Sequence, residues 1–164
     1  MNKTINIKNN KAIKEIRVFK DKQYSMMDIR FQNVHLKKIN ELVRLNIFSK
    51  NDIYINSMTL WELMQPIGET GSHNFHGLTP EDIWSAINGL SNPNYVFISK
   101  YGRYMVVPVM TSAFKEPLMV VIETGSGLVE NPEADINKIV TIYPKSDIDE
   151  LLNKISQKDI LFRK

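Results

Sequence analysis

The chain contains no cysteine among its 164 residues, so it can form neither a disulfide framework nor a thiolate metal site. It also lacks a long apolar run, because its longest apolar stretches, such as Met105–Met110, are far too short to span a bilayer. The N-terminus is polar and basic, without the apolar segment of a secretory signal peptide. We therefore expect a cytoplasmic protein, and the absence of cysteine is compatible with that compartment.

The residues that are present describe a globular chain with an uneven charge. Hydrophobic residues make up 43% of the chain and charged residues 24%, and the length fits one domain. The net charge is +3, but residues 1–50 hold 12 Lys/Arg and 4 Asp/Glu, whereas residues 51–164 hold 9 and 14. A basic front segment on a mildly acidic remainder indicates an anionic partner such as nucleic acid, although a solvated, lysine-rich surface gives the same pattern.

The spacing of apolar residues predicts an α+β protein in which helices come first and an antiparallel sheet, covered on one face, follows. Residues 1–12 are expected to be disordered, 13–19 to form a short strand, and 35–48 to form a helix. The other expected elements are a strand at 52–55, a short helix ending before Pro66, a loop at 68–77, a helix that Thr79 caps, strands at 95–100, 103–110, 117–123 and 138–143, a helix at 146–155 and a strand at 160–162.

One candidate site lies on the last strand before the closing helix. Because alternate residues of a strand face opposite sides, Val140 and Ile142 share one face, while Thr141 and Tyr143 share the other with Ile139. If the aliphatic pair faces the core, the hydroxyl and the phenol point together toward a groove or solvent. The alternative is that Thr and Tyr are here simply good strand formers.

Positive charge follows this strand directly. Lys145 and Ser146 stand at the start of the expected closing helix, and Ser146–Asp149 resembles a capping box with Asp in place of Glu. Lysines and helix N-termini both bind phosphate. A phosphate-binding role is therefore the functional interpretation of this segment.

Two of the three histidines, His73 and His76, lie three residues apart in a glycine-rich loop before the helix that Thr79 caps. Histidine titrates near neutral pH and can act as a general acid or base. The pair has no matching acidic third ligand, so the pattern does not favour a metal site, and no other cofactor is expected. Polar loop residues or helix-entry hydrogen bonds remain the alternative, and no Ser-His-Asp arrangement, P-loop or dinucleotide fingerprint is present.

The segments "HGLTPEDIWSAINGLSNPNYVF", "RYMVVPVM", "EPLMVVIET" and "NKIVTIYPK", followed by a closing helix, together resemble the C-terminal domain of phage MuF-type polyvalent proteins. Those domains belong with the phage members of the Barnase–EndoU–Colicin–RelE group of small ribonucleases. The resemblance covers roughly residues 58–162 and implies a nuclease core at 58–164, preceded by a basic segment and helix at 1–57. It also implies N-terminal helices packed on a four-stranded antiparallel sheet with a C-terminal helix. Thr141 departs slightly from the pattern, since the family often has Ser there.

The resemblance further implies metal-independent cleavage of RNA by the ribose 2′-hydroxyl. His76 matches the family's histidine, Thr141 its Ser/Thr and Tyr143 its tyrosine, with His73 as an extra candidate. Such cleavage needs a base, an acid and donors for the charge on phosphorus. The candidates for positive charge and RNA binding are Lys145, Arg103 and Lys100.

The expected protein is a ribonuclease toxin of a toxin–antitoxin, phage-defence or phage-borne module, with RNA as substrate and a neutralising antitoxin, protein or RNA, as partner. No membrane partner is expected. Two alternatives remain open: a catalytically inert, phage-related interaction module, and a nucleotidyl- or ADP-ribosyltransferase that uses the same residue types.

Overall fold

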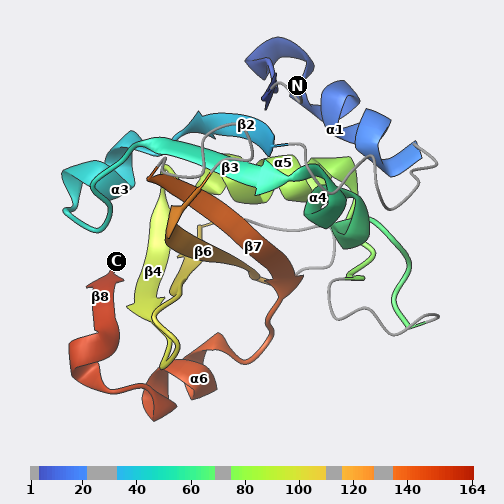
Figure 1. Cartoon of the computed structure of the whole chain (residues 1–164). Coiled ribbons are helices and arrows are strands. Elements are labelled where there is room, and N and C mark those ends of the chain that lie inside the picture. Colours follow the sequence, from blue (N-terminus) through green and yellow to red (C-terminus); the bar gives the residue numbers. More distant parts are fainter. Residues whose placement is uncertain (1–3, 22–32, 69–74, 110–115, 128–134) are drawn as a thin grey trace.

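The structure is a computed structural model that describes residues 4–21, 33–68, 75–109, 116–127 and 135–164 (Figure 1). Its strands are β1 (Ile5–Asn6), β2 (Asn33–Lys38), β3 (Asp52–Asn56), β4 (Pro93–Ile98), β5 (Tyr104–Pro108), β6 (Leu118–Ser126), β7 (Ile136–Pro144) and β8 (Ile160–Arg163). Its α-helices are α1 (Ala12–Asp21), α3 (Asn40–Arg44), α4 (Ser57–Leu63), α5 (Pro80–Gly89) and α6 (Ile148–Lys154), and two 3₁₀ turns are η1 (Asn9–Lys11) and η2 (Gln157–Asp159).

The strands form one mixed sheet of eight, in the order β1-β2-β3-β7-β6-β5-β4-β8. Strands β4 to β7 are antiparallel neighbours, but β3 pairs with β7 in parallel, and β1 pairs with β2 in parallel. The α+β class is therefore right, and the predicted four-stranded antiparallel sheet is wrong. The N-terminal strands extend the sheet beyond β7, and β8 extends it beyond β4. Figure 1 shows how strongly the sheet twists, since the ribbons of β3 and β6 cross steeply.

Three expectations for the N-terminal third are wrong. Residues 13–19 are helical, because α1 buries Ala12, Ile16 and Phe19 at helical spacing and leaves Val18 51% exposed. Residues 33–38 form a strand, and the expected helix at 35–48 shrinks to the five residues of α3. Residues 1–12 are not wholly disordered, because β1 lies among them and the side chain of Ile7 is buried in the core.

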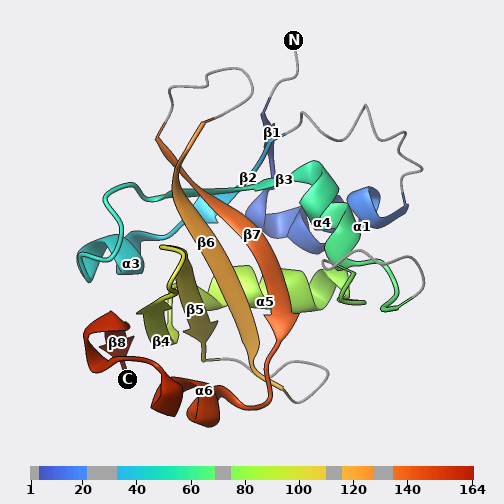
Figure 2. The same cartoon turned by 60° about the horizontal axis from the view of Figure 1, so that its bottom comes forward.

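The two faces of the sheet are covered by different helices. Val96, Val106 and Val120 face the main core, against which α1, α4 and α5 pack. The alternate residues Phe97 and Met119 face the opposite way, into a second, smaller cluster. This cluster consists of Phe97, Val107, Met119, Ile148 and Leu152. The last two come from α6, so the sheet is covered on both faces and not on one as predicted. Figure 2 shows α5 behind the sheet, with α6 at its lower end.

Candidate active site

The backbone around His76 is fixed by the end of α4 and the start of α5. The Gly77 N–H donates to the Gln65 carbonyl at 2.8 Å, and the Leu78 N–H donates to the Leu63 carbonyl at 2.9 Å. Gly77 has a φ of +61°, a conformation that glycine adopts without steric cost, and Leu78 is buried. The chain can therefore turn at Gly77 and place His76 just outside the core.

The start of α5 adds a second anchor directly after these residues. The Thr79 side chain accepts a hydrogen bond from the Asp82 N–H at 3.1 Å, and the Asp82 carboxylate accepts one from the Thr79 N–H at 3.0 Å. This reciprocal pair is the capping box that begins α5, with Pro80 in the first turn. The N-cap that the sequence predicts at Thr79 is confirmed, and it lies three residues from His76.

Thr141 and Tyr143 reach the same face of β7 because of an irregularity in that strand. Val121 and Ile122 are adjacent on β6, but their partners on β7 are Thr141 and Ile139, so Val140 is an extra residue in a β-bulge. Ile139 and Ile142 both lie in the main core. The prediction that Ile139 shares a face with Thr141 is therefore wrong, because the bulge breaks the alternation at Val140. Thr141 and Tyr143 lie on the face opposite Ile142.

The half of β7 that contains Thr141 and Tyr143 has none of the described strands paired to it on the side of β3. Strand β3 pairs with residues 137–139 of β7 and then leaves the sheet to begin α4. Residues 75–79, which lead into α5, lie beside the part of β7 that β3 does not cover, since His76 contacts Thr141 there. His76 meets Thr141, which is 65 residues later in the sequence, and Tyr143 at this edge.

We name His76, Thr141 and Tyr143 the histidine cluster. Thr141 Oγ1 and His76 Nε2 are 3.3 Å apart, a long hydrogen bond that the hydroxyl donates when Nε2 is the unprotonated nitrogen of the ring. The His76 and Tyr143 rings have centroids 5.8 Å apart and planes inclined by 37°. The three functional groups are therefore within reach of one phosphodiester.

The environment of the cluster moves its two titratable groups in opposite directions. Burial lowers the pKa of His76, so its imidazole is neutral at pH 7 and can accept a proton. Burial raises the pKa of Tyr143; the charge of Lys145 works against that shift and the charge of Asp147 adds to it. The phenol therefore keeps its proton at neutral pH. A neutral base beside a protonated acid is the arrangement that acid–base catalysis requires.

A groove of about 440 Å³ extends from Tyr143 along the face that α6 covers. Lys100, Lys145 and Lys154 line it together with Tyr143, above apolar side chains of the second cluster. The Lys145 ammonium contacts Asp147 at 2.9 Å, and a hydrogen bond to that carboxylate raises the pKa of Lys145. Lys154 contacts Glu150 at 2.7 Å. The Lys154 pair is largely exposed and the Lys145 pair is partly exposed, so solvent weakens both pairs and the two ammonium groups stay available to a stronger anion.

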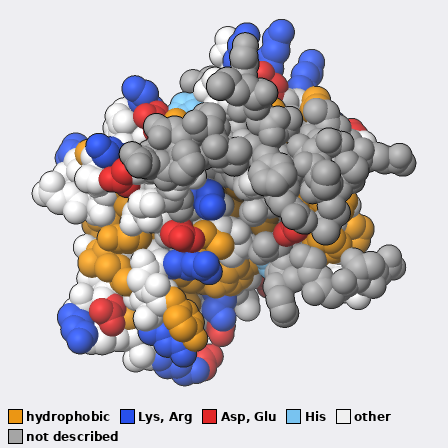
Figure 3. Space-filling model, viewed as in Figure 1, with side chains coloured by type: hydrophobic (Ala, Val, Ile, Leu, Met, Phe, Trp, Pro, Cys, Tyr) orange, Lys and Arg blue, Asp and Glu red, His pale blue; other side chains and the backbone are white. Residues whose placement is uncertain are grey.

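The other predicted site residues have different places. Arg103 does not line the groove; it pairs with Glu123 at 3.7 Å near the tip of the β4–β5 hairpin. His73 lies outside the described residues. The expected capping box at Ser146 is wrong, because α6 begins at Ile148 and no side chain caps it. Figure 3 shows lysine and arginine side chains beside hydrophobic ones in the lower part of the molecule, over α6 and β8.

Sequence reasoning missed two features of this region. The first is Lys154, which lines the groove together with Leu151 and Ile155. Because Lys154 follows Leu151 by three residues, the helical spacing of the apolar residues of α6 could have placed it on their side of the helix. Trp61 meets Phe75 edge-to-face with ring centroids 5.9 Å apart, immediately beside His76 in the chain. No local pattern signals this second contact, since it joins α4 to the following loop.

In the described part of the chain, no group of three or more His, Asp or Glu side chains is arranged to hold a metal ion. None of the helices described there is both long and apolar enough to cross a membrane. No family model matches the chain, and no curated protein or solved structure matches it either.

Proposed function

We propose that this protein is a metal-independent endoribonuclease that cleaves RNA by attack of a ribose 2′-hydroxyl on the adjacent phosphorus. The observation that supports the proposal best is the histidine cluster, in which a neutral imidazole, a hydroxyl and a protonated phenol converge from two distant segments. The resemblance to the phage MuF-type domains points to the same three residues.

In the proposed reaction, His76 Nε2 removes the proton of the 2′-hydroxyl. The 2′-oxygen then forms a bond to phosphorus, and the bond from phosphorus to the 5′-oxygen breaks. Tyr143 donates its proton to that leaving oxygen, so the products are a 2′,3′-cyclic phosphate and a 5′-hydroxyl. Thr141 exchanges its long contact with His76 for a hydrogen bond to a non-bridging oxygen. That exchange costs little, because a neutral hydrogen bond contributes only about 1 kcal/mol net.

The groove beside Tyr143 fits the strand that flanks the scissile bond. Lys100, Lys145 and Lys154 provide positive charge for phosphates, and the apolar floor of the groove suits unstacked bases of single-stranded RNA. We further propose that the enzyme works in the cytoplasm as a toxin of a toxin–antitoxin or phage-borne module. An antitoxin would inhibit it by covering the groove and the histidine cluster.

The test is cleavage of an end-labelled single-stranded RNA by the purified full-length protein in EDTA. We expect cleavage to persist, with 2′,3′-cyclic phosphate ends, because attack by the 2′-hydroxyl needs only a base and an acid. Thr141→Val should slow the reaction, whereas Thr141→Ser should retain most of it. A requirement for added Mg²⁺, or cleavage of the matching all-deoxy strand, would contradict the mechanism.

The groove is tested separately from the chemistry. Lys145→Gln should weaken RNA binding and reduce its dependence on salt, because one fewer counterion is released. The matched control is Lys20→Gln, which removes an equal charge from the exposed last turn of α1. Equal loss of affinity in both variants would show that only the net charge matters.

A further inference from the structure

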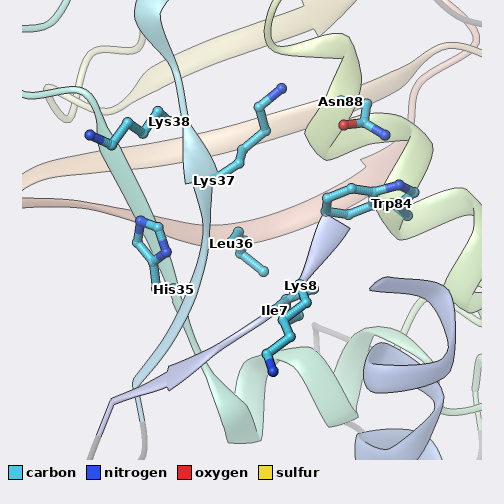
Figure 4. Close-up of a pocket in the computed structure, with 8 residues that line it drawn as sticks. All are labelled: Ile7, Lys8, His35, Leu36, Lys37, Lys38, Trp84 and Asn88. Atoms are coloured by element: carbon cyan, nitrogen blue, oxygen red, sulfur yellow. The ribbon is translucent and has the colours of Figure 1, made fainter. Parts of the chain in front are cut away.

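A second polar hollow lies away from the groove and does not include any residue of the histidine cluster. It has a volume of about 840 Å³ and lies between β2, the residues that follow β1, and the outer side of α5 (Figure 4). Three of its lining residues are lysines: Lys8, Lys37 and Lys38. All three belong to the basic first 50 residues, so this hollow is one place where the charge excess of that segment collects.

The lysines of the hollow are not neutralised by any carboxylate in the part of the chain that the structure describes. Among the residues that the structure describes, none of the three ammonium groups forms an ion pair, and the hollow has no Asp or Glu in its lining. The nearby carboxylates have other partners: Glu15 accepts from the backbone N–H of Lys8, and Asp52 pairs with His35 at 2.8 Å.

Lys37 is the most confined of the three. Its ammonium donates to the Ser91 hydroxyl at 2.7 Å, just beyond the end of α5. Burial lowers the pKa of Lys37, and no neighbouring negative charge offsets this shift. A half-buried ammonium with one neutral partner retains two donors for an anion. Phosphate would supply the missing negative charge and additional hydrogen-bond acceptors.

The remaining wall of the hollow is suited to an aromatic ring. Trp84 and Asn88 stand one turn apart on α5, and the Lys37 side chain extends toward Asn88 in Figure 4. The Trp84 indole is partly exposed while packing against the main core, which fixes its plane. Every nucleobase can stack on such a ring, and an amide beside it can bond to polar atoms on the base edge. The volume is within the range of small-molecule sites.

We propose that this hollow binds a nucleotide, with its phosphate at Lys37 and its base stacked on Trp84. The nucleotide is either a free mononucleotide or one unit of a nucleic-acid strand, since both present the same phosphate and base. This site is additional to the groove at Tyr143, and its occupancy does not depend on any cleavage.

Titration calorimetry with the full-length protein tests the proposal. The probes are AMP, adenosine, inorganic phosphate, and a four-nucleotide oligothymidylate, which has no 2′-hydroxyl and so cannot be cleaved by the proposed mechanism. We expect AMP to bind more tightly than adenosine or phosphate alone. The other supporting outcome is that the oligothymidylate binds and AMP does not. If the affinity for the oligothymidylate also falls in the variants below, the hollow binds one unit of a strand and not a free mononucleotide.

Lys37→Gln should weaken binding about tenfold or more, and Trp84→Ala about fivefold to a hundredfold, whereas Trp84→Phe should retain most of the affinity. The Trp84 variants change a partly exposed side chain on another element, so the test holds even if Lys37→Gln fails to fold. Lys158→Gln is the matched control, because it removes one exposed charge from η2, outside the hollow. Failure of AMP and of the oligothymidylate to bind would overturn the proposal, as would equal binding by wild type and Trp84→Ala. Binding of these probes and cleavage of RNA are measured separately, so the nucleotide site and the ribonuclease proposal can each fail without the other.

Discussion

Replacing His76 by alanine should slow RNA cleavage by about 10²–10⁴-fold while leaving the protein folded. At 1.36 kcal/mol for each factor of ten, that loss corresponds to about 3–5 kcal/mol in the activation free energy. The expected cost to folding is much smaller, because the His76 side chain is half-exposed and makes one long hydrogen bond, worth about 1 kcal/mol. The backbone hydrogen bonds of Gly77 and Leu78 do not involve the imidazole.

The pH dependence follows from the same geometry. A general base acts only when it is unprotonated, so kcat/KM should rise with pH through the pKa of His76 and then level off. Since burial lowers this pKa, the rise should be complete below the pH at which an ordinary histidine finishes titrating. An acidic limb centred above the ordinary histidine value would refute the assignment of His76 as a half-buried base.

Single-turnover cleavage of one RNA, measured after circular dichroism confirms folding, compares the variants directly. The matched control is His73→Ala, which removes the histidine three residues earlier in the sequence and should lose less activity. If His73→Ala is the more damaged enzyme, the roles of the two histidines are reversed. If neither variant loses activity, the two imidazoles take no part in cleavage and the ribonuclease proposal loses its main support.

Three further changes have defined outcomes. Tyr143→Phe should slow cleavage and remove the alkaline limb of the pH profile. Because burial raises the pKa of Tyr143, this limb should lie at a higher pH than the pKa of an ordinary tyrosine. A limb that survives in Tyr143→Phe would exclude Tyr143 as the acid. Gly77→Ala should lower the free energy of unfolding by about 1–2 kcal/mol because of the φ of +61°, and Gly77→Asn by less; denaturant titration would show equal losses if strain is not the cause. Gly89→Ala should cost about 1–3 kcal/mol in the same assay, because the new Cβ would lie 2.4 Å from Cβ of Pro108; an unchanged midpoint would mean that the proline moves freely.

Local signals were enough to predict which segments of the C-terminal two thirds of the chain are helices and which are strands, but not the sheet that they form. The Thr79-Pro80 start of α5, the Tyr101-Gly102 turn between β4 and β5, and the final strand β8 all appear in the structure as expected. Each depends on neighbouring residues, such as a capping side chain, a glycine with φ of +78° at Gly102, or a short apolar run bounded by polar residues.

The N-terminal third could not be predicted in this way, because its conformation is decided by distant partners. Leu36, Ile39 and Leu42 are all buried, so their spacing fits a helix, yet Leu36 is in a strand that β3 pairs with and Leu42 is in α3. Parallel pairing of β3 with β7 joins residues about 80 positions apart and has no local signature. The approach of His76 to Thr141 is equally long-range. The resemblance to a family, and not the spacing of residues, was what grouped them.

The bulge at Val140 is the point in β7 where the candidate site tolerates a change in the length of the chain as well as in the residue. Strand β7 is held on one side of Val140 by its pairs with β3 and on the other by its pairs with the first half of β6. Exchanging Val140 for another strand-forming residue leaves both sets of pairs in place. Deleting it also leaves them in place, because Ile139 and Thr141 then lie opposite Ile122 and Val121 in regular alternation and keep the faces that they have now. A deletion elsewhere in β7 has no bulge to absorb it, so it turns every side chain in one half of the strand to the opposite face. Across any set of homologues, position 140 should therefore vary freely in identity and accept a gap, whereas the positions on either side of it should not accept one.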